Sequence, residues 1–83
     1  HLIDQRLAAC VNVLRAVDSF YRWQGKIQED VEFLLVIKTS RELLPRLRTE
    51  WEKIHSYEIP ELIALPIVDG APNYLNWMDG ELG

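Results

Sequence analysis

Cysteine is nearly absent from this chain of 83 residues, because Cys10 is the only one. A single cysteine cannot form an intrachain disulfide or supply several thiolates to one metal ion, and its scarcity fits a reducing compartment. Long apolar runs are missing as well, and none approaches the roughly 20 residues that a membrane-spanning helix requires. The sequence therefore excludes a disulfide-stapled domain, and no membrane partner is expected.

Basic residues are also scarce, since 9 Lys and Arg stand against 13 Asp and Glu and give a formal net charge of -4. Neutralising phosphates requires a basic face, so no nucleic-acid partner is expected. Catalytic motifs are missing too: the sequence has no glycine-rich phosphate loop, no His-Glu-x-x-His and no Cys-x-x-Cys. We therefore expect a protein that is not an enzyme and whose partners are cations or other proteins.

The chain is expected to form a single domain over residues 1–83, because it contains no internal repeat, low-complexity tract or Gly/Ser linker. Apolar residues at helical spacing predict the end of an amphipathic helix over residues 2–9. β-branched and aromatic residues predict strands over residues 10–23 and 27–39. A reversal at residues 24–26 joins these strands, and the faltering alternation at Arg15 and Ala16 predicts a bend or bulge.

The second half of the chain predicts a helix, a strand and a helix. Ser40 is a candidate N-cap for a helix whose first turn tolerates Pro45. A short apolar run predicts a strand over residues 62–68, and the last helix is expected over residues 72–82. The apolar stripe of the first of these helices consists of Leu43, Leu44, Leu47, Trp51 and Ile54.

This order of elements predicts an α+β fold, namely a ferredoxin-like split β-α-β sandwich with a long β-hairpin, a C-terminal helix and no first strand. Without a first strand, residues 62–68 would lack a neighbour on their inner side. The chain starts at His1 rather than Met, so we expect the missing strand and any targeting signal to precede it. The free edges of the sheet need partners, which other subunits of an oligomer can supply.

Several stretches, in this order and spacing, give the chain a specific resemblance to the CutA divalent-cation tolerance family over essentially its whole length. They are LAACVN at residues 7–12, SFYRWQGKI at 19–27, IKT at 37–39, HSYEIPE at 55–61 and YLNW at 74–77. The resemblance implies a ferredoxin-like subunit in a tight homotrimer that is cytoplasmic in bacteria. It also implies a role in tolerance to copper and other divalent cations, with no catalytic reaction.

Three features depart from the pattern of that family. Ser56 stands where proline is usual, and Leu14 and Arg15 replace a common pair formed by an apolar residue and proline. The first strand is absent, and in some members this strand carries a thiol considered to be a copper ligand. The resemblance therefore implies a metal site, and without the first strand that site is expected to be incomplete in this chain.

The candidate metal ligands are His55, Glu61 and Cys10, for copper or another divalent cation bound weakly. A neutral imidazole binds copper and zinc, and the resemblance places a His at position 55. Each residue also has a structural interpretation. His55 can interact with the last carbonyls of a helix, Glu61 can be a solvated carboxylate, and Cys10 can be a buried core residue.

Lys38 emerges from an apolar strand, where it either meets a carboxylate or bound anion or lies in water at the strand end. Five aromatic residues either line a pocket for a small molecule or pack in the core and between subunits. They are Trp23, Trp51, Tyr57, Tyr74 and Trp77.

Two functions follow as alternatives. The first is a metal-binding homotrimer that contributes to tolerance of divalent cations. The second is a trimeric signalling or interaction module that binds a small ligand or a partner protein, an interpretation that rests on analogy of fold.

Overall fold

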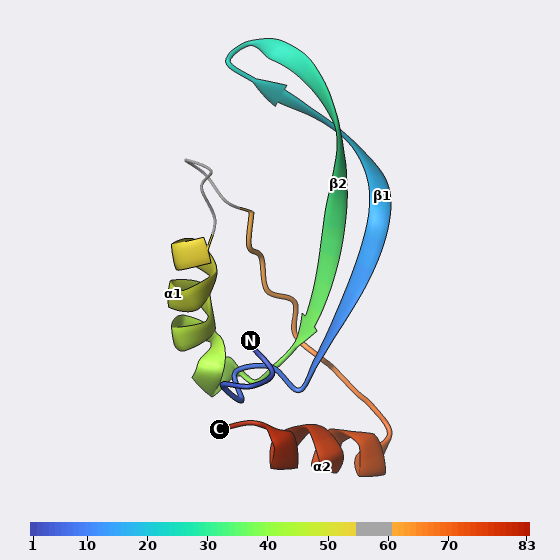
Figure 1. The fold of residues 1–83 in the computed structure, drawn as a ribbon. Coiled ribbons are helices and arrows are strands. Elements are labelled where there is room, and N and C mark those ends of the chain that lie inside the picture. The colour runs from blue at the N-terminus through green and yellow to red at the C-terminus, as the bar shows by residue number, and fades with distance from the viewer. Residues whose placement is uncertain (55–60) are drawn as a thin grey trace.

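The computed structural model describes residues 1–54 and 61–83, which form an α+β arrangement of one long hairpin and two helices (Figure 1). The predicted hairpin, the helix after Ser40 and the C-terminal helix are confirmed. The elements, in chain order, are β1 (Cys10–Trp23), β2 (Lys26–Lys38), the 3-10 turn η1 (Arg41–Leu43), α1 (Leu44–Ile54) and α2 (Pro72–Glu81). None of the helices in these described ranges is long and apolar enough to cross a membrane.

The hairpin is an antiparallel pair whose register runs from Cys10 opposite Lys38 to Trp23 opposite Lys26. A two-residue reversal of this kind needs positive φ at both turn residues, because the resulting backbone twist matches that of the two strands. Gln24 and Gly25 have φ values of 51° and 79°. The predicted reversal is therefore confirmed, and its glycine occupies a left-handed position that other residues adopt only at a cost.

A β-bulge interrupts the hairpin where the sequence predicts a bend. The register shifts between Leu14 and Val17, and Ala16 has a φ of 58°. The guanidinium carbon of Arg15 lies 5.7 Å from the centre of the Phe33 ring. A bulge bends the strand and increases its twist. The part of the hairpin beyond it, residues 15–33, extends past the helices and bends over at its tip toward the side of α1 (Figure 1). We call residues 15–33 the arm.

The buried core lies at the opposite end of the molecule, which we call the base. It brings together the segment before β1, the middle of α1 and the end of α2. Its buried apolar residues are Leu7, Ala8, Ala9, Leu47 and Met78. Backbone hydrogen bonds also join segments at the base. The Ala9 amide donates to the Lys38 carbonyl of β2 at 2.8 Å, and the Gly83 amide donates to the Arg6 carbonyl at 3.0 Å.

The helix predicted over residues 2–9 is wrong, because these residues form hydrogen-bonded turns. The Gln5 amide donates to the His1 carbonyl, as in one helical turn, but the Leu7 amide reaches back to Leu2. Arg6 has a φ of 58°, and a left-handed residue cannot continue a right-handed helix. The turns nevertheless bury the apolar Leu7, whose side chain is 1% exposed.

The helix after Ser40 begins less regularly than predicted. Ser40 precedes η1 and makes no capping hydrogen bond with its side chain. Pro45 is the second residue of α1, in the first turn, as the sequence predicts. Leu47 is buried, but Ile54 is 57% exposed, so the far end of the predicted apolar stripe lies outside the core.

The strand predicted over residues 62–68 is also wrong, because this segment has no regular secondary structure. A strand needs a neighbour to pair its backbone, and within the described residues the sheet consists of β1 and β2 alone. Pro66 removes one donor from the segment, and Val68 is 91% exposed. The segment descends as an extended connection to α2 (Figure 1).

Candidate functional site

The three predicted metal ligands do not form one described site. His55 lies outside the described residues. Glu61 is exposed at the start of the connection to α2, and Cys10 is the first residue of β1, at the base. Within residues 1–54 and 61–83, no three His, Cys, Asp or Glu side chains are grouped so that they could hold a metal ion.

Cys10 is partly buried rather than fully buried, so its prediction as a core residue holds only in part. It directly follows the buried Ala9, which lies just before the strand begins. The Cys10 sulfur lies 3.9 Å from the Asn12 side-chain oxygen, at the limit of a weak S–H hydrogen bond. Across the hairpin it faces Lys38.

Lys38 meets an aromatic residue of α2, a partner that the sequence analysis does not identify. Its Nζ donates to the Tyr74 hydroxyl at 3.3 Å and lies 5.5 Å from the centre of the Tyr74 ring. The Tyr74 and Trp77 rings are neighbours on α2, with centroids 5.6 Å apart. This group of Lys38, Tyr74 and Trp77 connects the end of β2 with α2, and we call it the lysine–aromatic group.

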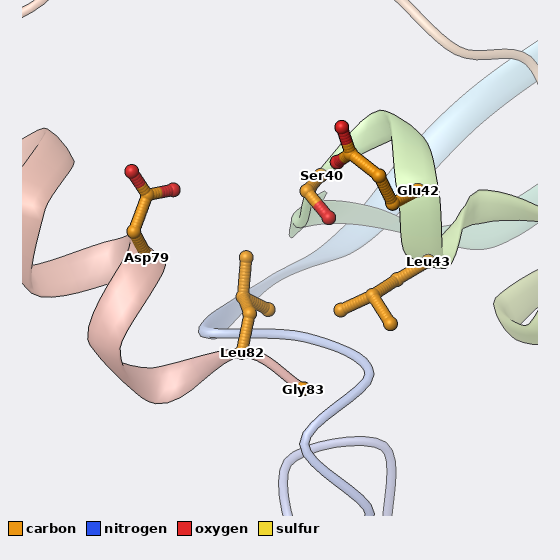
Figure 2. Close-up of a pocket in the computed structure, with 6 residues that line it drawn as sticks. All are labelled: Ser40, Glu42, Leu43, Asp79, Leu82 and Gly83. Atoms are coloured by element: carbon orange, nitrogen blue, oxygen red, sulfur yellow. The ribbon is translucent and has the colours of Figure 1, made fainter.

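A shallow pocket lies between η1 and the end of α2 (Figure 2). It has a volume of about 280 Å³, and its lining consists of Ser40, Glu42, Leu43, Asp79, Leu82 and Gly83. Figure 2 shows the Glu42 and Asp79 carboxylates on opposite sides, above Leu43 and Leu82. A second pocket, of about 370 Å³, adjoins it and shares Ser40 and Asp79.

These pockets contain none of the residues that the sequence analysis proposes as metal ligands. Their acidic side chains, Glu42, Asp69 and Asp79, attract cations, but within the described residues they are not grouped so that they could hold a metal ion. No motif in the sequence marks Glu42 or Asp79. Only the approach of α2 to η1 brings them together.

The arm exposes an apolar stripe on one face. Phe20, Ile27, Val31 and Phe33 are 65–68% exposed. The alternation along β2 puts Ile27, Val31 and Phe33 on the same face, and Phe20 joins them because it pairs with Glu29. The same pairings put Arg22, Glu29 and Asp18 on this face, so the exposed apolar side chains alternate with charged ones. Exposed apolar side chains gathered on one face are a candidate contact surface for another protein.

Comparison with known proteins matches residues 1–81 to the family described as "CutA1 divalent ion tolerance protein". The "Divalent-cation tolerance protein CutA" of Thermus thermophilus is 44% identical over 82 residues, which cover 99% of this chain and 80% of that protein. "Protein CutA, chloroplastic" of Arabidopsis thaliana is 46% identical over 77 residues. They cover 93% of this chain but only 42% of the plant protein, so the chain spans less than half of that relative.

Comparison with solved structures also finds a protein of the same fold. The divalent cation tolerance protein (Cut A1) from Thermus thermophilus superposes with a TM-score of 0.95 at 44% sequence identity. The match covers 99% of this chain and 80% of that one.

Proposed function

This chain belongs to the CutA1 divalent ion tolerance protein family, and from that premise we propose that it acts in tolerance to copper and other divalent cations. It does so as a metal-binding homotrimer without catalytic activity. The single observation that supports this proposal best is the family match, which extends over residues 1–81.

The proposal includes the ferredoxin-like arrangement, completed by a first strand that is not among these 83 residues. The connection over residues 62–68, which has no regular secondary structure, supports it, because an added strand between β2 and this connection would pair backbone groups on both. A longer version of the protein, with a first strand added before His1, tests this arrangement. Hydrogen exchange should slow at residues 62–68 in the longer protein, and unchanged exchange there would contradict the arrangement.

The homotrimer is supported by the apolar stripe of the arm. Phe33 is 66% exposed, and burying such side chains against other subunits stabilises an assembly by about 25 cal/mol for each Å² of apolar surface removed from water. Light scattering on the wild-type protein should give three times the mass of one chain. Phe33→Ser should lower that mass, whereas the matched control Ile54→Ser should keep it, because Ile54 is exposed on α1 and lies outside the arm.

We assign His55 as the principal metal ligand, Glu61 as an oxygen ligand and Cys10 as a minor contributor. Imidazole suits oxidised copper, and an exposed carboxylate such as Glu61 is accessible to a cation. Cys10 is partly buried at the base, a position that limits its access to a cation from solvent.

Titration calorimetry with copper tests this assignment. His55→Ala should weaken copper binding more than Glu61→Gln, and Cys10→Ser should leave it nearly unchanged. Because a protonated imidazole has no free lone pair, wild-type affinity should fall as the pH drops below about 6.5. The assignment would be falsified if a trimeric His55→Ala protein kept the copper affinity and pH dependence of the wild type.

The proposal also places the protein in the cytoplasm, supported by its single cysteine and by the resemblance of its sequence to bacterial members of the family. The name of the Arabidopsis relative assigns that protein to the chloroplast, so location varies within the family. Cell fractionation followed by detection of the intact protein tests the location. Recovery from a membrane or an exported fraction would contradict it.

A further inference from the structure

Lys38 has no acidic partner in the described part of the chain. The ion pairs that the structure shows within residues 1–54 and 61–83 join His1 to Asp4 and Lys53 to Glu50. The Lys38 side chain is instead held by the hydroxyl and ring of Tyr74. An ammonium group has three donors, and the hydrogen bond to Tyr74 occupies one of them.

Two contacts with Tyr74 locate this ammonium group. Lys38 is partly buried at the end of β2, and its backbone carbonyl accepts the hydrogen bond from the Ala9 amide. The position of the ammonium over the Tyr74 ring adds an attraction to the ring face. The positive charge therefore lies beside Tyr74, in a hydrogen bond that is exposed to solvent.

The neighbouring rings favour a particular kind of anion. Tyr74 and Trp77 are 41% and 47% exposed and tilted by 36° to each other, so apolar ring surface lies open beside the ammonium group. The Tyr74 hydroxyl can donate its own proton to an anionic oxygen while its oxygen still accepts from Lys38. A charged oxygen group attached to a flat apolar body would use all of these features.

We propose that the lysine–aromatic group is a binding site for small organic anions, in which Lys38 and Tyr74 hold a carboxylate or phosphate and Trp77 contacts an apolar body. The site uses none of the proposed metal ligands, although Cys10, the minor contributor among them, is the cross-strand neighbour of Lys38. It gives the second function considered for this sequence, a ligand-binding module, a defined location.

An NMR titration of the complete 83-residue protein at constant ionic strength tests the site, with benzoate, phenyl phosphate and benzyl alcohol as probes. The two anions carry the carboxylate and the phosphate on the same kind of ring, and the alcohol carries no charge. Saturable shifts at the Trp77 indole and at Lys38 are expected with at least one anion and not with the alcohol. Equal shifts with the alcohol, or no saturation with either anion, would overturn the proposal.

Three variants separate anion binding from a merely structural contact. Lys38→Met keeps most of the apolar stem and should weaken anion binding about tenfold or more, because a charged hydrogen bond is lost. Tyr74→Phe keeps the ring and should weaken anion binding about threefold or more. Lys53→Met is the matched control, since Lys53 is a lysine whose ammonium is paired with Glu50 on α1, and it should bind as the wild type does.

The same measurements distinguish a free anion from a carboxylate supplied by a second copy of the chain. If Lys38→Met lowers the oligomer mass in light scattering while the wild type binds none of the probes, the partner of Lys38 is a carboxylate of another subunit, and the ligand site is overturned. A Lys38→Met protein that stays folded and keeps the wild-type affinity for the anions would overturn it as well.

Discussion

The base and the arm contain parts of the same two strands, but they have opposite surroundings. At the base, the chain buries Leu7, Leu47 and Met78 and connects separate segments through hydrogen bonds. Along the arm, none of residues 15–33 is buried, and the apolar stripe faces outward. Intrachain burial therefore stabilises the base. The arm relies on its backbone ladder and cross-strand pairs, and its apolar side chains stay exposed.

The largest expected effect is at the base. Leu47 is 2% exposed, so Leu47→Ala removes buried methyl groups and leaves a cavity, and it should lower the free energy of unfolding by about 2–5 kcal/mol. Ile54→Ala is the matched control on the same helix and should cost no more than about 0.5 kcal/mol, since Ile54 is exposed. Urea melts at one protein concentration give both values. Equal losses would show that the base is not the centre of stability.

The turn of the arm should give the next largest effect. Gly25 has a φ of 79°, and Gly25→Ala forces a side chain into the left-handed region at a cost of roughly 1–2 kcal/mol. Gly80 lies in α2 with open space around it, so Gly80→Ala should have the opposite sign and stabilise the protein slightly. Thermal melts of the two variants check the signs. A neutral Gly25→Ala would mean that the turn adopts another conformation.

A hydrogen bond at the base should have a smaller effect. The Thr39 hydroxyl donates to the Leu7 carbonyl at 2.6 Å in a partly buried place, so Thr39→Val should cost about 1 kcal/mol. Thr49→Val removes a similar bond to the Pro45 carbonyl, but on the exposed side of α1, and should cost less. Denaturant unfolding compares the two. A larger loss of stability for Thr49→Val than for Thr39→Val would contradict the greater contribution assigned to the base.

The smallest effect is expected in the arm. The Tyr21 hydroxyl donates to the Asp30 carboxylate across the strands, and both groups are exposed. Tyr21→Phe should therefore cost about 0.5 kcal/mol, the usual size of a cross-strand contribution. Hydrogen exchange of the arm amides measures this local change. A loss as large as that of Leu47→Ala would show that the arm is stabilised within the single chain.

The hairpin, its reversal and its bulge could be predicted because local signals specify them. Gly25 permits a positive φ, and the alternation of apolar residues falters at Arg15 and Ala16. The helix over residues 2–9 and the strand over residues 62–68 were predicted wrongly, because the same apolar patterns occur in turns and in unpaired extended chain. The metal-ligand predictions stay untested, with His55 outside the described residues.

By itself, the sequence determined the α+β class, the long hairpin, the C-terminal helix and the family, because these depend on spacing and on motifs that can be read along the chain. Only the tertiary structure decided which apolar residues are buried. Leu47 and Ile54 belong to the same predicted stripe, yet only Leu47 lies in the core. The tertiary structure also decided that Lys38 meets Tyr74. These residues are 36 positions apart in the sequence and approach each other only because α2 packs against the end of β2.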